Sequence, residues 1–197
     1  MKKAPIYSLT ISLDFWSPKI WRRIWIRGDE KLNYIAWVLF TSMGWTGYHL
    51  SEFIIRDKFY GNISIEDPLE EWLDWTKYTL YEIAKTKITQ FKFLYDFGDG
   101  WEMTVKIREL KDLDKSAPYP VCVNGKNAAP PEDVGSYVGF EHFIKIMKDE
   151  NHPKYKEISE MWISDTFDPS YFSVDEVNDI IQDKKVFQEY VNEKFGF

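Results

Sequence analysis

The chain has 197 residues, a formal net charge of −7, and a composition that is 44% hydrophobic and 18% aromatic, with nine tryptophans. This length can bury a sizeable core, and we favour one domain over residues 1–197. The acidic balance argues against a general nucleic-acid binder, and the single Cys122 excludes an intrachain disulfide framework. No apolar run approaches the length of a membrane span, so we expect a soluble, cytoplasmic protein.

The N-terminal part of the chain predicts two strands followed by a helix. Residues 6–15 alternate between apolar and polar side chains, which is typical of a half-buried strand. Residues 20–27 predict a second strand, in which Arg22 and Arg23 point to opposite faces, so at least one of them should be paired or stacked. From Leu32 the apolar residues repeat at helical spacing, and Gly44 should end this helix as its C′ residue.

The next segments alternate between regular and irregular patterns. Residues 48–57 predict a strand with His49 and Phe53 on one face. Residues 59–75 contain Gly61 and Asp67-Pro68, so we expect a loop with room for a short helix. Residues 79–85 predict another short helix.

Residues 91–107 predict a β-hairpin around which the rest of the chain is organised. Apolar residues alternate on both sides of Gly98-Asp99-Gly100, and a loop of these three residues sets Phe97 opposite Trp101. The same register sets Asp96 opposite Glu102, and like charges in this position are destabilising. A cation should therefore lie nearby, and we expect Arg22 or Arg23 in preference to a metal ion.

The remainder of the chain predicts a short apolar piece at 119–123, a turn at 124–127, and a stiff loop that contains Pro130-Pro131-Glu132-Asp133. Helical patterns then dominate to the C-terminus, including a capping box at Ser173 and Glu176. The predicted fold class is α+β. We expect a single domain with an antiparallel sheet of about five strands, a long helix after the second strand, and a helical C-terminal third packed on one face.

Several motifs, in order, resemble the root-inducing-plasmid (pRiA-plasmid) ORF-three-like family over about residues 6–181. They are Pro18–Ile24, Met43-Gly44-Trp45 with His49-Leu50 and Phe53, Tyr95–Asp99 with Trp101, Pro130–Asp133 with Gly135, Asn151-His152-Pro153, and Phe167-Asp168-Pro169 with Phe172. Two departures stand out: Met103 replaces a histidine common in the family, and Val134-Gly135-Ser136 replaces a Cys-Gly-Gly.

The resemblance implies a mixed fold with an antiparallel sheet, but it implies little about activity. Members occur on plasmids and near insertion elements, and some carry a resolvase-like label. A serine resolvase needs a nucleophilic serine among clustered arginines, and this chain has no such constellation.

The candidate catalytic residues are Asp96, Asp99, Glu132, Asp133 and His49. The four carboxylates can converge on a hard cation such as Mg²⁺ or Ca²⁺, and His49 can meet a hairpin carboxylate as a general base. The favoured interpretation is structural: the acids cap turns or pair with arginine, and His49 is a satisfied, partly buried histidine. We therefore assign no metal and no cofactor.

The candidate binding residues are Arg22, Arg23, Trp45 and Trp101, because tryptophans at turns are hard to bury and can stack with arginine on bases or a peptide. The favoured function is a non-enzymatic module of plasmid or mobile-element context that recognises a protein or nucleic-acid partner. The alternative is a metal-dependent, hydrolase-like enzyme. The oligomeric state stays open.

Overall fold

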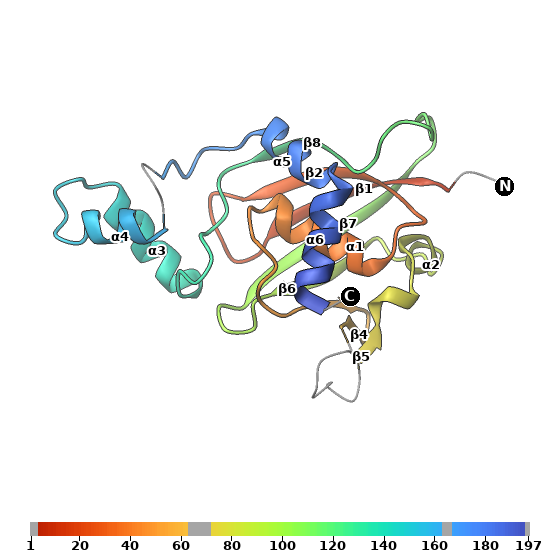
Figure 1. The fold of residues 1–197 in the computed structure, drawn as a ribbon, viewed down its shortest axis with the longest axis horizontal. Coiled ribbons are helices and arrows are strands. Elements are labelled where there is room, and N and C mark those ends of the chain that lie inside the picture. The colour runs from red at the N-terminus through yellow and green to blue at the C-terminus, as the bar shows by residue number, and fades with distance from the viewer. Residues whose placement is uncertain (1–3, 63–71, 163–166, 196–197) are drawn as a thin grey trace.

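The computed structural model describes residues 4–62, 72–162 and 167–195, and these form one mixed sheet of eight strands with helices (Figure 1). The strands are β1 (Ile6–Leu13), β2 (Trp21–Arg27), β3 (Ser51–Ile55), β4 (Lys58–Gly61), β5 (Trp72–Asp74), β6 (Gln90–Tyr95), β7 (Trp101–Leu110) and β8 (Val121–Lys126). Their order is β5-β4-β3-β6-β7-β1-β2-β8. Neighbours run antiparallel except β4 and β5, which are parallel.

Two α-helices lie between strands in the described chain, and four follow the last strand. The α-helices are α1 (Leu32–Ser42), α2 (Leu80–Ala84), α3 (Ser136–Met147), α4 (Tyr155–Trp162), α5 (Val174–Ile181) and α6 (Lys184–Phe195), and a 3₁₀ turn spans Trp75–Lys77. The predicted α+β class is confirmed, but a sheet of about five strands is too small. The segment 59–75, predicted as a loop, contributes β4 and β5, which are too short to show a period; its residues 63–71 lie outside the described part of the chain.

Helix α1 forms the centre of the core, between the sheet and α6. Beneath it, the Phe40 ring lies 5.5 Å from Tyr95 at the end of β6. Above it, Tyr190 of α6 lies 5.4 Å from Phe40, and Phe187 lies 5.3 Å from Trp37. The helix is buried on nearly all sides, as expected for a helix that is apolar all round. Its predicted end is confirmed, because Gly44 has a φ of 88° and donates its N–H to the Thr41 carbonyl.

The C-terminal third divides between two places, so the prediction that it packs on one face holds only for α5 and α6. Helices α3 and α4 lie at one end of the sheet (Figure 1). There, Tyr137 of α3 packs 4.9 Å from Trp101, and Phe140 packs 4.5 Å from Trp16. In the part of the chain that is described, no helix is both long and apolar enough to cross a membrane.

The hairpin of β6 and β7 forms, but its register differs from the prediction by two residues. Tyr95 pairs with Trp101 and Phe93 with Met103, so the connection runs from Asp96 to Gly100. Asp96 leaves the strand because its backbone has a φ of 58°. A shift by two keeps every side chain on its predicted face, which is why the alternation pattern alone cannot detect it.

The expected contact between the hairpin acids and Arg22 or Arg23 is wrong. Glu102 lies opposite Leu94, and its carboxylate is 3.9 Å from the Lys92 ammonium. Strand β2, which carries both arginines, is separated from β6 by β7 and β1. Neither arginine forms an ion pair with any described residue.

Glu52 of β3 is a buried carboxyl group whose pKa is raised by burial, against a hydrogen bond from the Trp72 side chain that lowers it. Because the folded-state pKa lies above the unfolded value, its contribution to stability is greatest below the unfolded pKa and is lost as pH rises through the folded pKa. A Glu52→Gln variant, which keeps an acceptor for Trp72, should raise the melting temperature at pH 7 and lose this advantage near pH 4. Thermal melts across this range test it, with exposed Glu150→Gln as the control. Equal melting curves at pH 7 would contradict it.

Candidate functional site

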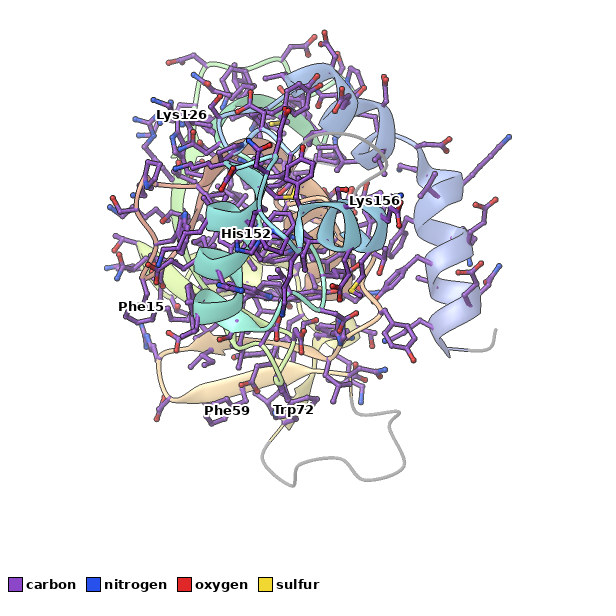
Figure 2. The ribbon with its side chains drawn as sticks, turned by 90° about the vertical axis from the view of Figure 1, so that its left-hand side faces the viewer. Phe15, Phe59, Trp72, Lys126, His152 and Lys156 are labelled. Carbon is purple, nitrogen blue, oxygen red and sulfur yellow. The ribbon has the colours of Figure 1, made fainter. Side chains whose placement is uncertain are left out.

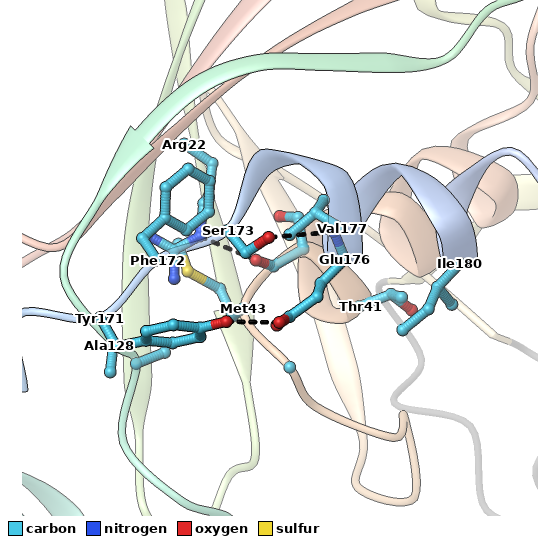
Figure 3. A pocket seen from close by; sticks show the side chains of 13 residues that line it. Arg22, Thr41, Met43, Ala128, Tyr171, Phe172, Ser173, Glu176, Val177 and Ile180 are labelled. Carbon is cyan, nitrogen blue, oxygen red and sulfur yellow. Dashed lines mark hydrogen bonds between the residues drawn. The ribbon is translucent and has the colours of Figure 1, made fainter. Parts of the chain in front are cut away.

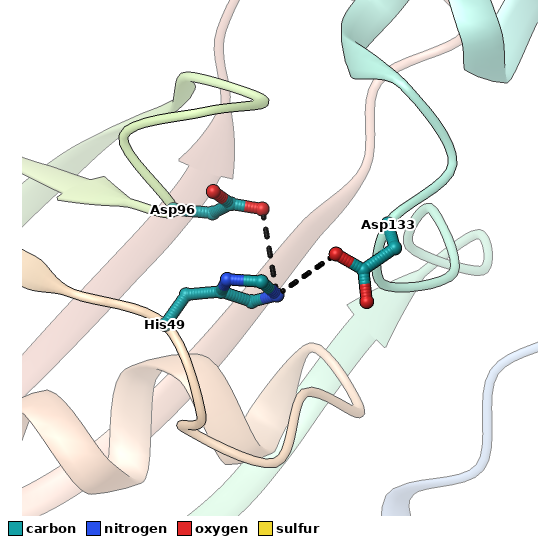
Figure 4. A group of neighbouring side chains, drawn as sticks. All are labelled: His49, Asp96 and Asp133. Carbon is teal, nitrogen blue, oxygen red and sulfur yellow. Dashed lines mark ion pairs between the residues drawn. The ribbon is translucent and has the colours of Figure 1, made fainter.

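Three side chains from separate segments converge beside the hairpin turn (Figure 4). The His49 Nε2 atom lies 3.2 Å from Asp133 Oδ1 and 3.6 Å from Asp96 Oδ2. One ligand atom from each residue lies within 4.8 Å of the other two. The structure therefore brings together three of the residues named as catalytic candidates, and the side chain next to Asp96 is the His49 imidazole, not an arginine.

Asp96 is held in place by its own turn. Its side chain is buried, and Oδ1 accepts hydrogen bonds from the backbone N–H groups of Gly98, at 2.9 Å, and Asp99, at 3.3 Å. These bonds aim the second oxygen at His49. Asp133 also has a φ of 58°, so both aspartates occupy the left-handed region. Aspartate tolerates this conformation better than most residues, but it still costs free energy, and such strain concentrates at functional sites.

The other two candidate acids, Asp99 and Glu132, hold the loops and do not join the cluster. Asp99 Oδ2 accepts a hydrogen bond from Gly135 N–H at 3.1 Å, which ties the proline-stiffened loop to the hairpin. Glu132 accepts from the Thr46 hydroxyl at 2.8 Å and from the Tyr95 hydroxyl. Burial and the neighbouring Glu132 raise the pKa of Tyr95, so this phenol stays a neutral donor.

Trp45 and Trp101 are 3% and 1% exposed, so the prediction that they form an exposed binding surface is wrong. Trp45 donates its indole N–H to the Pro130 carbonyl at 2.8 Å and stacks on Tyr95, with ring centroids 4.8 Å apart and an interplanar angle of 6°. Burial is possible because the loops around each turn close over the rings. Both tryptophans therefore support the site from within the core.

The site is open to solvent on one side. The Asp133 side chain is 74% exposed, whereas that of His49 is 20% exposed. Three apolar side chains next to His49 and Asp96 in the chain are also exposed: Tyr48 at 79%, Leu50 at 42% and Phe97 at 40%. Two of the three cluster residues are therefore flanked in the chain by apolar side chains that reach the surface.

Arg22 has a different role from the one predicted. Its guanidinium faces the core, where Nε donates to the Ser42 carbonyl at 2.8 Å and Nη1 donates to the carbonyls of Trp21 and Lys126 at 2.9 and 3.0 Å. Phe172 stacks 4.2 Å from the guanidinium carbon, beside a cavity of about 230 Å³ (Figure 3). Burial lowers the pKa of Arg22 to about 10, so it stays charged at neutral pH. It ties the C-terminal end of α1 to β2 and β8.

These observations define an α+β protein with a histidine–aspartate cluster at the end of its central hairpin. The model of the family described as plasmid pRiA4b ORF-3-like protein matches residues 5–176, and the chain belongs to this family. The uncharacterized protein y4hQ of Sinorhizobium fredii (strain NBRC 101917 / NGR234) is 31% identical over 185 residues, which cover 91% of this chain and 92% of that protein.

A solved structure shares the fold. The crystal structure of MM3350, a protein of unknown function from Methanosarcina mazei Go1, matches with a TM-score of 0.74 at 28% identity. The match covers 88% of this chain and 97% of that one. Neither relative has a described activity, so function must be argued from the site itself.

The cluster was only partly accessible to sequence reasoning. His49, Asp96 and Asp133 were each selected by residue type and local pattern, but none of them shows ligand-loop spacing with another. The alternating pattern predicts one strand over residues 48–57. It does not indicate that His49 lies outside β3, which begins at Ser51.

Proposed function

We propose that the chain binds a divalent metal ion through His49 Nε2, Asp96 Oδ2 and Asp133 Oδ1. The convergence of these atoms from three loops is the observation that carries the proposal. The imidazole suits borderline ions such as Zn²⁺ and Fe²⁺, and the two carboxylates also suit Mn²⁺. These ions fit the mixed site better than Ca²⁺ or Mg²⁺, the hard cations considered for a carboxylate-only site.

Two of the three distances between the ligand atoms, those from His49 Nε2, suit a shared ion. Metal bonds of about 2.0–2.2 Å at a tetrahedral angle place two ligand atoms about 3.3–3.6 Å apart. The His49 contacts of 3.2 and 3.6 Å are close to this range. An imidazolium paired with both aspartates would fit the same distances, and metal titration distinguishes the two explanations. The hydrogen bonds to Asp96 Oδ1 supply the outer-shell support that metal ligands commonly have.

The arrangement favours catalysis over a purely structural role for the ion. Three protein ligands leave coordination positions open, as in metal-dependent hydrolases. The side of the cluster that carries Asp133 is exposed to solvent. We therefore favour the metal-dependent, hydrolase-like alternative. The non-enzymatic module built on Arg22, Arg23, Trp45 and Trp101 has less support, because only Arg23 of these four is exposed.

Zinc or manganese should stabilise the wild-type protein and should not stabilise an Asp133→Asn variant. The exposed Asp133 has His49 as its ion-pair partner, and asparagine also tolerates a positive φ, so this variant should fold. If the Kd is about 10 µM, 1 mM metal adds about 2.7 kcal/mol of stability, which raises the melting temperature by about 5–10 °C. Thermal melts and calorimetry measure both effects.

The matched control is Asp57→Asn, which makes the same change at an exposed turn aspartate between β3 and β4. It should retain wild-type metal binding. Equal metal-induced shifts in the melting temperatures of Asp133→Asn and Asp57→Asn would contradict the proposal. The absence of any heat of binding with Zn²⁺, Mn²⁺, Mg²⁺ and Ca²⁺ would also contradict it. A metal-dependent turnover of chromogenic esters, lost in Asp133→Asn, would extend it to catalysis.

A further inference from the structure

The face of the sheet that points away from α1 carries small polar side chains in its centre. Ser8, Thr10 and Ser12 of β1 lie on this face, opposite to Leu9 and Ile11, which belong to the core. In Figure 2, the labelled Lys126 lies on the side of the molecule opposite the pale-blue helix α6. The short side chains of β1 run along the middle of a strip of this face, and the longer side chains of its neighbours β2 and β7 lie on either side of them.

Positive charges lie along both sides of this strip. The register sets Thr10 between Arg23 and Lys106, and Ser8 between Trp25 and Arg108. Strand β8 lies next to β2 on the side away from β1, and there Lys126 pairs with Trp21. The cations Arg23, Lys106, Arg108 and Lys126 are all exposed, and none forms an ion pair with a described residue.

This concentration of positive charge contrasts with the chain as a whole, whose net charge is −7. Two further cations of the outer face are neutralised: Arg27 binds Asp29 through two nitrogens, at 3.0 and 2.8 Å, and Lys92 contacts Asp14 at 2.5 Å. On the outer face, the four cations without an ion pair to a described residue lie over β7, β1, β2 and β8, where they would attract an anionic ligand.

Two aromatic rings accompany these charges. Trp21 and Trp25 lie on the same face of β2 and are half-buried, so part of each indole is accessible. Four residues along a strand separate them by about 13 Å. Arg23 lies between them, with its guanidinium carbon 5.5 Å from the Trp21 ring centroid. A ligand that matches this strip carries repeated negative charges and flat rings.

We propose that this outer sheet face binds single-stranded nucleic acid, with bases stacked on Trp21 and Trp25 and phosphates against Arg23, Lys106, Arg108 and Lys126. Unpaired bases expose the ring faces that tryptophan needs, whereas a duplex keeps them stacked inside. An acidic peptide would match the charges but not the indoles. The proposal does not depend on the metal site, which lies at the hairpin turn.

Fluorescence anisotropy with a labelled oligo-dT of about 12 nucleotides tests the proposal at about 50 mM salt and above. The double variant Arg23→Gln/Lys106→Gln should bind at least tenfold more weakly. Its log–log salt slope should be shallower by about 1.4, because each phosphate contact on a single strand contributes about 0.7. Trp25→Leu should weaken binding by about fivefold or more, with less quenching of tryptophan fluorescence.

The matched control is Lys154→Gln/Lys156→Gln, which removes the same charge from exposed positions at and just before the start of α4. It should bind as the wild type does. The proposal is overturned if the wild type shows no binding at a Kd on the order of 100 µM or below. It is also overturned if the two double variants bind equally, if a duplex binds as tightly as oligo-dT, or if polyglutamate competes as well as oligo-dT.

Discussion

An Arg22→Met variant should lose about 3–5 kcal/mol of unfolding free energy. The guanidinium is the donor to the carbonyls of Ser42, Trp21 and Lys126, and the residue is 3% exposed. A methionine fills much of the volume but donates nothing. The bond to Ser42 is buried and the bonds to Trp21 and Lys126 are partly buried, and a buried carbonyl left without a donor costs about 1–3 kcal/mol. The stacking of Phe172 on the cation is lost as well. For a chain of this size, the melting temperature should fall by about 10 °C.

The neighbouring arginine provides the matched control. Arg23→Met makes the same change one residue later, on the exposed outer face, and surface changes of this kind usually stay within about 0.5 kcal/mol. Urea denaturation followed by tryptophan fluorescence measures both variants. Similar midpoints for Arg22→Met and Arg23→Met would show that the carbonyl contacts of Arg22 contribute little. The two variants should also separate by function, since only Arg23 belongs to the proposed nucleic-acid face.

Local patterns predict those parts of the fold that local physics determines. Helix α1 was predicted to begin at Leu32 and to end at Gly44, because its apolar period and the glycine conformation are properties of the segment itself. The two arginines of β2 were correctly predicted to point to opposite faces, because strand alternation fixes this. Which of them is buried depends on the position of α1, and that is a tertiary property.

The hairpin shows where such reasoning ends. Alternation assigned the correct face to each residue from 91 to 95 and from 101 to 107, but the turn length came from a Gly-Asp-Gly motif that suits a tight loop. The actual turn begins earlier, at Asp96, whose N–H bonds to the Leu50 carbonyl and whose side chain reaches His49. Contacts with a segment far away in the sequence therefore choose the register.

The candidate site was predictable in its residue types but not in its membership. The sequence predicts candidate site residues from carboxylates at constrained turns. In the structure, Asp96 and Asp133 face His49, whereas Asp99 and Glu132 accept hydrogen bonds from backbone N–H or hydroxyl groups. No single-sequence pattern makes this division, because it depends on how the loop after Pro130 packs on the hairpin. The same packing buries Trp45, although its position at a turn predicts an exposed side chain.

A Trp45→Ala variant tests whether that packing supports the site, and it should cost about 3–5 kcal/mol of unfolding free energy. The indole is 3% exposed, stacks on Tyr95, and donates to the Pro130 carbonyl next to the loop that carries Asp133. Its removal leaves a cavity under all three converging segments. If the variant folds, its affinity for zinc or manganese should fall tenfold or more, since loss of outer-shell support typically costs 10–100-fold in metal affinity.

Trp45→Phe separates packing from hydrogen bonding. Phenylalanine keeps an aromatic ring against Tyr95 but cannot donate to Pro130, so it should lose less stability than alanine while still releasing the Pro130 end of the loop. We therefore expect an intermediate unfolding free energy, measured in urea, together with a clear loss of metal affinity, measured by calorimetry. Wild-type metal affinity in both variants would show that Asp133 reaches His49 without this anchor. In that case other bonds, including Asp99–Gly135, Glu132–Thr46 and Glu132–Tyr95, would position the loop.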